Sequence, residues 1–591
     1  MALTRPTSTQ LQNSPALDLT MDEYADAIDA LGLSVKSYGA LGDGSNQTTA
    51  INNTITDATG EVYFPPGTYV VDPATLTEKS NVRWRGAGMY ASVIKLKNSG
   101  NGKLLNWGAS GPLAGISFVD LGFDGNMVNQ TNGATRDDRS GLFLRQIAGL
   151  SLIRCGFTNF RSGAAVRTYG CSDILYKGNR FWNNGLRAVL SGAESLSTSA
   201  TDVEVNSTAG WPSSGKFYAA GVVATYTSLG TSPTRFVGCT IASGTKALAA
   251  GTWVFPIGAT DADVLICDAT FTGAATDYRA IANRYFSNTD TGTAMDGVVG
   301  FSVLGNGYRD NLLGCGIAWV GTETGGTADS CEDGVIEGNT IIGPNLSSVE
   351  TQGIKSAKYN AAGGDGGNNR NIVIEGNVIR LVDRSLWLDT LDDSIVQGNI
   401  LKNAVGPNRQ HVLLATGTET VNNLALKDNT LEDASVGVRI DTSGGVTDLT
   451  MESNKFSTDV TTPISGTIPA TARVLGNMGA QDNIVTYSRG GTVLSPTAAV
   501  NLIVWRAPVA CVVTAVKGYR GGGTGATINA RRNGASNHLA SALSLTSADT
   551  WMDGGTVQNT AYAAGDRLEI MVVTVAGSPT QVAVQVEFVR S

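Results

Sequence analysis

The sequence predicts an all-β chain: a parallel β-helix that is interrupted once by a small inserted β domain and is followed by an antiparallel β-sandwich. Three features lead to this prediction. A short Gly-Asn unit with alternating apolar flanks recurs along the chain, the recurrence breaks once for more than a hundred residues, and longer apolar strands replace it after residue 480. Glycine fills 73 of 591 positions, well above the roughly 7% of ordinary proteins, as a fold with many turns requires.

Composition and charge exclude several classes of protein. Hydrophobic residues make up 42% of the chain, which is enough for a large core and argues against disorder. The net charge of -9, without a basic block, argues against nucleic-acid binding. No run of about 18 apolar residues is present, so we expect no membrane insertion. The first 20 residues lack the basic start and apolar stretch of a secretion signal.

Cysteine and histidine usage restricts the available chemistry. The seven cysteines stand singly, and the chain has two histidines, His411 and His538. Zinc sites, haem attachment, disulfide frameworks and Ser-His-Asp triads all need more of these residues or closer spacing. We therefore expect no metal and no cofactor, and we expect the chemistry to use carboxylates, tyrosine, lysine or arginine.

The Gly-Asn unit defines the solenoid. Its copies from Asn306 onward are 22–38 residues apart, and a degenerate copy carries Cys155 in place of the asparagine. Glycine and asparagine both tolerate left-handed backbone angles at corners. In stacked turns the asparagine amides can hydrogen-bond from one turn to the next, about 4.8 Å apart. The predicted ladder contains Asn179, Asn306, Asn339, Asn377, Asn399, Asn429, Asn454 and Asn477.

The first segment of the repeat region carries a more specific signal. Residues 34–46 read SVKSYGALGDGSN, a helix-like stretch follows, and residues 60–71 read GEVYFPPGTYVV. This phrase resembles the start of the pectate-lyase-like, single-stranded right-handed parallel β-helix superfamily, which includes bacteriophage tailspikes. The sequence departs from the family at 46–48, where Asn-Gln-Thr replaces Asp-Asp-Thr. The helix that follows is expected to cap the open end of the solenoid.

Breaks in the pattern divide the chain into five parts. The resemblance to tailspikes implies a virion-attachment arm with a neck helix at the N-terminus, and a C-terminal sandwich that serves trimerisation or carbohydrate binding. Trp505 and Trp551 of the sandwich are either sugar platforms or core residues. The predicted parts are the arm (1–33), the first part of the β-helix (34–195), the inserted domain (196–285), the second part of the β-helix (286–480) and the sandwich (481–591).

A second strand column in the repeats supplies the candidate site. If Ile354, Leu386, Val412 and Val438 face inward, their following residues face outward, because side chains alternate along a strand. The outward residues then include Lys355, Trp387, Leu413 and Arg439, and two positions further Ala357, Asp389, Ala415 and Asp441.

Glycoside hydrolysis needs two carboxyl groups, about 5–5.5 Å apart for retention and about 6.5–9.5 Å apart for inversion. Acidic residues and aromatics concentrate between 319 and 393, and sugar rings pack on aromatic faces. By resemblance to tailspike endoglycosidases, two aspartates of one turn would face a glutamate of the preceding turn. The predicted catalytic residues are Asp389, Asp392, Glu350 and Glu323, and the predicted carbohydrate-binding residues are Trp387, Trp319, Tyr359 and Arg384.

The resemblance implies a homotrimeric tailspike that binds and hydrolyses a bacterial surface polysaccharide, lipopolysaccharide O-antigen or capsule, during host adsorption. Such an endo-glycosidase would be made in the host cytoplasm, reside in the virion and act at the bacterial cell surface. Its arm would bind a phage tail or baseplate protein. Two alternatives remain: a lyase that cleaves a uronic-acid polymer by β-elimination with Lys355, Tyr359 and Arg384, and a non-catalytic adhesin.

Overall fold

The computed structural model describes residues 32–590 in two compact units, which divide close to residue 473. It leaves out several internal segments: 131–140, 161–163, 186–187, 209–210, 212, 220–221, 258–263, 268–274, 289–290, 312–315, 324–327, 346, 348–349, 359–368, 418, 442–443, 470 and 481–486. The predicted N-terminal arm therefore lies almost wholly outside the described residues. Among the described residues, no helix is long and apolar enough to cross a membrane.

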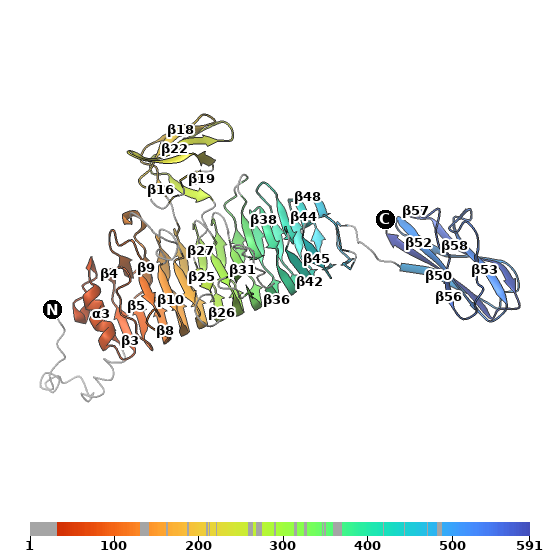
Figure 1. Ribbon diagram of the computed structural model, residues 1–591, viewed down its shortest axis with the longest axis horizontal. Coiled ribbons are helices and arrows are strands. Elements are labelled where there is room, and N and C mark those ends of the chain that lie inside the picture. Colours follow the sequence, from red (N-terminus) through yellow and green to blue (C-terminus); the bar gives the residue numbers. More distant parts are fainter. Residues whose placement is uncertain are drawn as a thin grey trace, which may run out of the picture. The chain divides into compact units, whose positions relative to one another are not determined.

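The first unit is a right-handed parallel β-helix built from three long sheets, named A, B and C here. One turn passes through sheets C, A and B in that order, and strands of successive turns pair in parallel (Figure 1). The right-handed crossover is the one that L-amino acids favour. The predicted fold class is thus confirmed.

Sheet A has the most strands of the three sheets among the described residues. In chain order its strands are β1 (Leu33–Ser34), β3 (Glu61–Phe64), β5 (Arg83–Gly86), β8 (Leu113–Val119), β11 (Ile147–Ile153), β14 (Ser172–Lys177), β26 (Ala275–Ile281), β29 (Val298–Leu304), β33 (Glu332–Glu337), β36 (Asn369–Glu375), β39 (Leu391–Gln397), β42 (Thr420–Lys427), β45 (Gly445–Thr447), β46 (Thr450–Glu452) and β49 (Arg473–Leu475).

Sheet B follows sheet A after a short corner. Its strands are β2 (Asp43–Asn46), β4 (Gly67–Val71), β6 (Ser92–Leu96), β9 (Gly122–Asp124), β12 (Gly156–Thr158), β15 (Arg180–Trp182), β27 (Arg284–Phe286), β30 (Gly307–Arg309), β34 (Thr340–Ile342), β37 (Val378–Arg380), β40 (Ile400–Lys402), β43 (Thr430–Glu432) and β47 (Lys455–Phe456).

Sheet C precedes sheet A in each turn and carries the predicted site. Its strands are β7 (Leu105–Trp107), β10 (Leu142–Arg145), β13 (Val166–Tyr169), β25 (Val264–Cys267), β28 (Thr293–Asp296), β31 (Ile317–Glu323), β35 (Gln352–Lys358), β38 (Arg384–Leu388), β41 (Gln410–Leu414), β44 (Ala434–Ile440) and β48 (Val460–Ser465), with β32 (Ala328–Asp329) paired to β31.

Helical elements are few and short among the residues that the structure describes. The helix α3 (Thr48–Asp57) buries Ile51 and Ile55 at the N-terminal end of the solenoid (Figure 1). Capping the open end in this way covers apolar side chains that no further turn would bury. Within the described ranges, the other helical elements are the 3-10 turns η1 (Val35–Tyr38) and η2 (Met127–Asn129).

The predicted asparagine ladder is present at the corner between sheets A and B. From Asn283 to Asn454, each Oδ1 accepts hydrogen bonds from the backbone N–H and the Nδ2 of the asparagine one turn before, as in Asn339 to Asn377, both at 2.9 Å. Cys155 donates its backbone N–H to Asn179 at the first rung. Asn283 fills the rung between Asn179 and Asn306. The Gly-Asn pattern missed it because Ala282, with a left-handed φ of 54°, replaces glycine there.

A second asparagine ladder, which was not predicted from the sequence, also follows residues in the left-handed conformation. Asn184, Asn288 and Asn311 are buried and bond from turn to turn at 3.0–3.2 Å. Each follows a non-glycine residue with a positive φ, which hides the signal because no Gly-Asn dipeptide appears. Between the ladders, five aromatic rings stack along the inside of sheet B at 4.6–5.1 Å: Phe123, Phe157, Phe181, Tyr285 and Tyr308.

The inserted domain is present, but its boundaries differ from the predicted 196–285. It begins at β16 and ends at β24, and β25, β26 and β27 already pair within the solenoid sheets. The missed rung at Asn283 explains the late predicted end. The strands of the insert are β16 (Ala188–Val189), β17 (Glu194–Ser197), β18 (Thr201–Glu204), β19 (Gly215–Ala219), β20 (Val222–Tyr226), β21 (Ser228–Thr231), β22 (Thr234–Ile241), β23 (Thr245–Leu248) and β24 (Trp253–Ile257).

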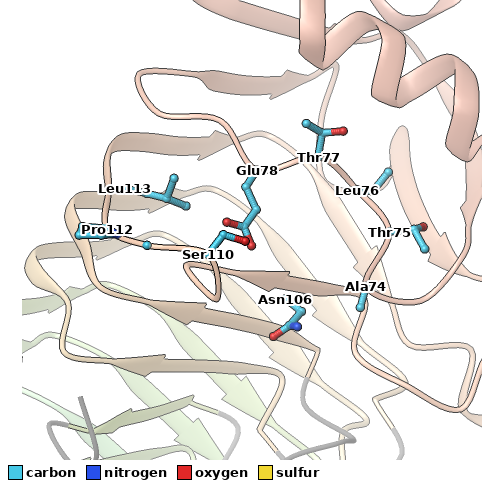
Figure 2. A pocket seen from close by; sticks show the side chains of 10 residues that line it. Ala74, Thr75, Leu76, Thr77, Glu78, Asn106, Ser110, Pro112 and Leu113 are labelled. Carbon is cyan, nitrogen blue, oxygen red and sulfur yellow. The ribbon is translucent and has the colours of Figure 1, made fainter.

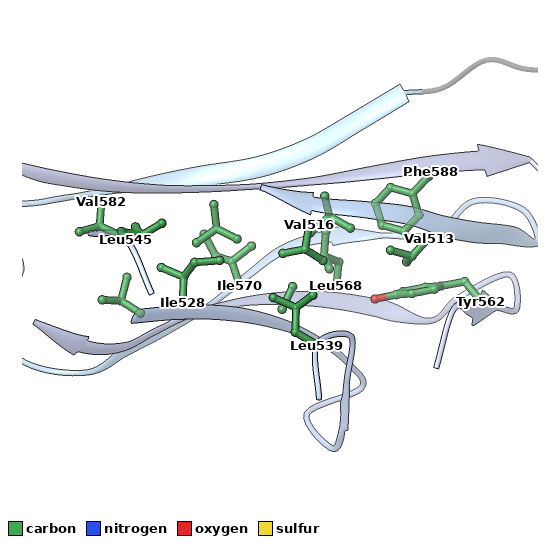
Figure 3. Packing of buried hydrophobic residues seen from close by; sticks show 14 of the residues in the cluster. Val513, Val516, Ile528, Leu539, Leu545, Tyr562, Leu568, Ile570, Val582 and Phe588 are labelled. Atoms are coloured by element: carbon green, nitrogen blue, oxygen red, sulfur yellow. The ribbon is translucent and has the colours of Figure 1, made fainter. Parts of the chain in front are cut away.

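The second unit is an antiparallel sandwich of two sheets, β50-β59-β52-β56 with β57, and β51-β58-β53-β54 with β55. Figure 3 shows side chains of both sheets meeting in one core, among them Val516, Ile570 and Phe588. Its strands are β50 (Tyr487–Leu494), β51 (Val500–Arg506), β52 (Cys511–Gly521), β53 (Gly525–Arg532), β54 (Ser536–Asn537), β55 (Leu543–Ser544), β56 (Trp551–Asp553), β57 (Ala561–Tyr562), β58 (Arg567–Ala576) and β59 (Gln581–Arg590).

The two tryptophans of the sandwich have different environments. Trp505 packs on the core, with its ring centroid 4.9 Å from that of Phe588. Trp551 is 49% exposed beside Tyr519. Of the two, Trp551 alone retains an accessible ring for a ligand, and Trp505 is a core residue.

His411 gives the solenoid a pH-dependent stability. Its ring is fully buried, with Nδ1 beside the Ser385 hydroxyl (3.0 Å) and Nε2 donating to the Glu432 carbonyl (2.8 Å). Burial lowers the pKa of His411 from 6.5 to about 4. Below pH 6.5 the unfolded chain therefore takes up a proton that the folded chain does not bind, and stability falls as the pH drops toward 4.

We expect the wild-type solenoid to lose roughly 2–3 kcal/mol more than the His411→Gln variant between pH 7.5 and 4.5. Thermal melts of both proteins at the two pH values measure this difference. Equal pH dependence of the two melting temperatures would show that His411 does not carry the effect.

Candidate functional site

The predicted inward column of sheet C is confirmed, whereas the predicted outward column is confirmed only in part, since Leu413 is buried. Ile354, Leu386, Val412 and Val438 stand opposite one another in successive turns and are buried. The next column, which the alternation directs outward, contains Lys355, Trp387, Leu413 and Arg439 in the same register. The outer face of this sheet is therefore where the predicted site has to be sought.

Three of the predicted site residues meet on this face, together with Lys355 and Asn408. We call these five residues, Glu350, Lys355, Arg384, Trp387 and Asn408, the Trp387 cluster. The Arg384 guanidinium lies 4.3 Å and the Lys355 ammonium 4.2 Å from the centroid of the Trp387 ring. Both distances allow cation–π attraction.

Glu350 supplies the carboxylate of the Trp387 cluster. Arg384 forms an ion pair with it at 3.2 Å, and Nδ2 of Asn408 donates to Oε1 at 3.0 Å. The Glu350 side chain is 50% exposed, whereas that of Arg384 is only 11% exposed. The carboxylate is thus held in position and remains accessible to a ligand.

A second carboxylate lies directly behind Glu350. Nδ2 of Asn408 also donates to Oδ2 of Asp383 at 2.7 Å, so the two acceptor oxygens are at most about 6 Å apart. Asp383 is completely buried, and its Oδ1 accepts the backbone N–H groups of Asn408 and Arg409. Asp383 therefore anchors the turn that carries Asn408. Its carboxylate is used in these contacts and does not face a bound substrate.

Asp389 does not take part in the Trp387 cluster. It follows the C-terminal end of β38, whereas Arg384 begins this strand and Glu350 precedes β35, the neighbouring strand one turn earlier. The residue is only 6% exposed, and its Oδ1 accepts hydrogen bonds from the backbone N–H and the hydroxyl of Thr416. The expectation that Asp389 points outward was wrong, because the strand ends there and the side chain ties one turn to the next.

Asp392 lies in sheet A and not beside Asp389. It stands between Arg370 and Asn422 in the register, and its Oδ1 accepts from the backbone N–H and the Nδ2 of Asn422. The short corner between β38 and β39 separates the two aspartates onto different faces. The predicted arrangement of two aspartates facing Glu350 is therefore absent.

The remaining predicted residues are only partly described. Trp319 stands opposite Met295 and Ser356 in β31, and both of these neighbours are buried. Glu323 belongs to the antiparallel hairpin of β31 with β32, beyond the paired part of sheet C. The side chains of Trp319 and Glu323, and all of Tyr359, lie outside the described residues.

A pocket that was not predicted from the sequence lies at the N-terminal end of sheet C. Its volume is about 520 Å³, and Glu78, Asn106 and Ser110 line it (Figure 2). Arg145 donates to Oδ1 of Asn106 at 2.8 Å. Burial lowers the pKa of Arg145, and the nearby charge of Glu78 opposes this shift. The lining residues come from two separate segments, 74–78 and 106–113, so no single local motif in the sequence indicates the pocket.

Cations and aromatic rings also meet beside this pocket. Lys103 and Arg145 lie 4.0 and 4.8 Å from the ring centroid of Phe143, and Arg167 lies 4.7 Å from that of Tyr169. From β10 to β38 the sheet advances six rungs, or about 30 Å. The outer face of sheet C thus carries two groups of basic and aromatic side chains, each with one carboxylate. Within the part of the chain that the structure describes, no group of three His, Cys, Asp or Glu residues fits a metal ion.

Comparison with known protein families gives a match to the first segment of the solenoid. Residues 32–110 match the family described as rhamnogalacturonase A/epimerase, pectate lyase-like. This range contains the motifs at 34–46 and 60–71, so the pectate-lyase-like character of this part of the chain is confirmed.

Individual relatives are distant. The chain is 24% identical over 210 residues to the plasmin and fibronectin-binding protein A of Streptococcus pneumoniae, covering 30% of this chain and 28% of that protein. It is 35% identical over 113 residues to the mannuronan C5-epimerase AlgE3 of Azotobacter vinelandii, covering 17% and 6%. Among solved structures, ORF18 of Geobacillus virus E2 is 14% identical, with a TM-score of 0.39 over 94% of this chain and 80% of that one. The chain thus spans less than a third of either relative.

Proposed function

We propose that this chain binds and depolymerises an acidic bacterial surface polysaccharide, O-antigen or capsule, along the outer face of sheet C. The observation that supports this proposal most strongly is the Trp387 cluster, in which two cations, an aromatic ring and an accessible carboxylate adjoin one another. Aromatic rings accept the apolar faces of sugars, and guanidinium groups bind carboxylates. The N-terminal pocket extends the same chemistry along the sheet.

Glu350 is the residue to which we assign proton transfer. In hydrolysis its carboxyl group would exchange a proton with the attacking water or with the leaving glycosidic oxygen. Sequence-based reasoning placed Asp389 and Asp392 beside it, but neither reaches this face. The proposal therefore depends on Glu350 and on the basic residues that position an acidic sugar.

β-Elimination is a second candidate, favoured by the placement of Lys355 and Arg384 against the same ring. In that reaction a base removes the proton on the carbon next to the uronate carboxylate, the bond to the leaving oxygen breaks, and a carbon–carbon double bond forms. Arg384 would neutralise the carboxylate, Glu350 would take the proton, and the Lys355 ammonium would protonate the leaving oxygen.

Product analysis separates these reactions. The purified protein is incubated with lipopolysaccharide and capsule of candidate hosts, and the products are read by mass spectrometry. Fragments that have gained one water support hydrolysis, and fragments with an unsaturated uronate support elimination. Polymer that binds but stays intact would contradict both reactions and indicate an adhesin.

We further propose that the chain is a homotrimeric phage tailspike. Exposed apolar residues on the edge strand β51 support self-association through the sandwich, since Leu502 is 39% and Ile503 61% exposed. An exposed edge strand with apolar side chains readily pairs with another chain. The N-terminal arm would attach the trimer to the phage tail or baseplate.

The double variant Leu502→Glu/Ile503→Glu is expected to be monomeric, because the new charges repel one another across a shared edge. Light scattering should give about three times the 61.3 kDa chain mass for the wild type and one chain mass for the variant. Ser547→Glu, in an exposed loop of the same unit, is the matched control. A monomeric wild type, or a trimeric double variant, would contradict this use of the sandwich.

A further inference from the structure

The outer face of sheet B contains a cavity that the proposed function does not use. Its volume is about 570 Å³, and strands β15, β27, β30 and β34 contribute to its walls. The lining includes three arginines and one acidic residue, Asp310. This makes the cavity basic in a chain whose net charge is -9. The side chains that matter below are Arg180, Arg284, Phe286 and Arg309.

Two of the arginines stand directly opposite each other without an acidic partner. Arg180 and Arg284 are paired in the register of β15 and β27, about 4.8 Å apart along the helix. The guanidinium of Arg284 makes no hydrogen bond or ion pair with any residue that the structure describes, although its backbone N–H donates to the Asn179 carbonyl at 2.9 Å. Arg180 donates to the Tyr90 hydroxyl at 2.9 Å. Like charges in directly opposite positions repel, and an anion between them would remove this repulsion.

Arginines on sheet A, in contrast to Arg180 and Arg284, form ion pairs with acidic residues. Arg154 pairs with Asp120 at 2.7 Å, and Arg279 pairs with Asp173 at 2.5 Å, in each case across neighbouring turns. Arg279 belongs to the same turn as Arg284, only one strand earlier. The lack of an acid beside Arg284 is thus a property of the cavity and not of the repeat.

Gly307 keeps room for the Arg284 guanidinium. It stands opposite Arg284 on the next rung, and a Cβ at this position would lie only 2.3 Å from Nη1 of Arg284. Gly307 does not have a positive φ, so the backbone itself does not require glycine there. The missing side chain therefore leaves space in which the guanidinium can lie over the sheet.

An aromatic surface adjoins the arginines. The ring of Phe286 lines the cavity and stacks on Trp182 with centroids 6.1 Å apart and an interplanar angle of 7°. Tyr90 is 63% exposed next to Trp182. Flat apolar surfaces of this kind receive the face of a sugar ring, while charged groups take its substituents.

We propose that this cavity is a second glycan site, which binds a sugar that carries an acidic group, either a carboxylate or a phosphate. The acidic group lies between Arg180 and Arg284, and the sugar ring lies against Phe286. The site is independent of the reaction proposed for sheet C, because its residues belong to another face of the solenoid.

Calorimetric titration tests this proposal with three probes: tetragalacturonate, its fully methyl-esterified form and mannose 6-phosphate. The Glu350→Gln background prevents cleavage during the measurement. We expect at least one of the two charged probes to bind once per chain, and we expect the methyl ester not to bind. Arg284→Gln should weaken the binding of the charged probe at least tenfold. Binding of only one charged probe identifies the acidic group as carboxylate or phosphate.

Arg279→Gln is the matched control, since it removes an arginine from the same turn on sheet A. The proposal is overturned if neither charged probe binds, if the ester binds equally well, or if Arg279→Gln and Arg284→Gln have the same effect. Depolymerisation by Arg284→Gln with Glu350 intact is measured in parallel. Loss of cavity binding with retained turnover separates this site from the catalytic proposal.

Discussion

Replacing Glu350 by glutamine is expected to lower the rate of polysaccharide cleavage by roughly 10²–10⁴-fold, the usual contribution of a positioned proton-transfer group. The amide keeps the size of the side chain and its contact with Asn408, but it cannot exchange a proton. Binding of the polymer should remain measurable, because Lys355, Arg384 and Trp387 are intact. Release of reducing ends, or of unsaturated ends if the reaction is elimination, measures the effect.

Glu332→Gln is the matched control for this experiment. Glu332 is an acid on sheet A that pairs with Arg370 at 2.7 Å, away from the outer face of sheet C. Its replacement should leave turnover unchanged. If Glu350→Gln cleaves the polymer at the wild-type rate while circular dichroism shows a normal fold, the catalytic centre lies elsewhere and Glu350 has only a binding or structural role.

Replacing Asn377 by alanine is expected to destabilise the solenoid by about 3–5 kcal/mol. Oδ1 of Asn377 accepts two bonds from Asn339, and its Nδ2 donates to the Ile336 carbonyl and to Asn399, all at 2.9 Å. The variant leaves the N–H of Asn339 and the carbonyl of Ile336 buried without these partners. Each such group costs about 1–3 kcal/mol.

Denaturant unfolding of the full chain, followed by circular dichroism, measures this loss. Asn53→Ala makes the same chemical change at an exposed position of α3 and should alter stability by less than about 0.5 kcal/mol. An equal, small effect of both substitutions would mean that the ladder contributes little beyond ordinary turn formation.

The asparagine positions show which corners of the solenoid can be predicted from local sequence and which cannot. Asn306, Asn339 and Asn377 were predictable because each follows a glycine at a corner and is flanked by alternating apolar residues. Asn283 was missed because Ala282 adopts the left-handed conformation that glycine normally marks. A corner is recognised in the sequence only where it uses a residue typical of that conformation, although the structure accepts others.

The site residues depend on corner lengths, which strand periodicity does not encode. Side-chain alternation correctly placed Lys355 and Trp387 outside, because it acts within one strand. Asp389 and Asp392 are three residues apart in the sequence, yet the corner between them directs one into a turn-to-turn contact and the other into sheet A. Only the fold shows which side of a corner each carboxylate occupies.

The sequence by itself therefore determined the class of fold, the column of turns with its buried asparagines, the presence of an insert and the C-terminal sandwich. These features are predictable because they depend on short-range periodicity in the sequence, and each repeat shows the same short pattern. The tertiary structure decided which charged and polar groups meet: Glu350 with Arg384 and Asn408, Glu78 with Arg145, and Arg180 with Arg284. Such encounters join residues from different turns, and their spacing depends on how many residues each corner and loop contains.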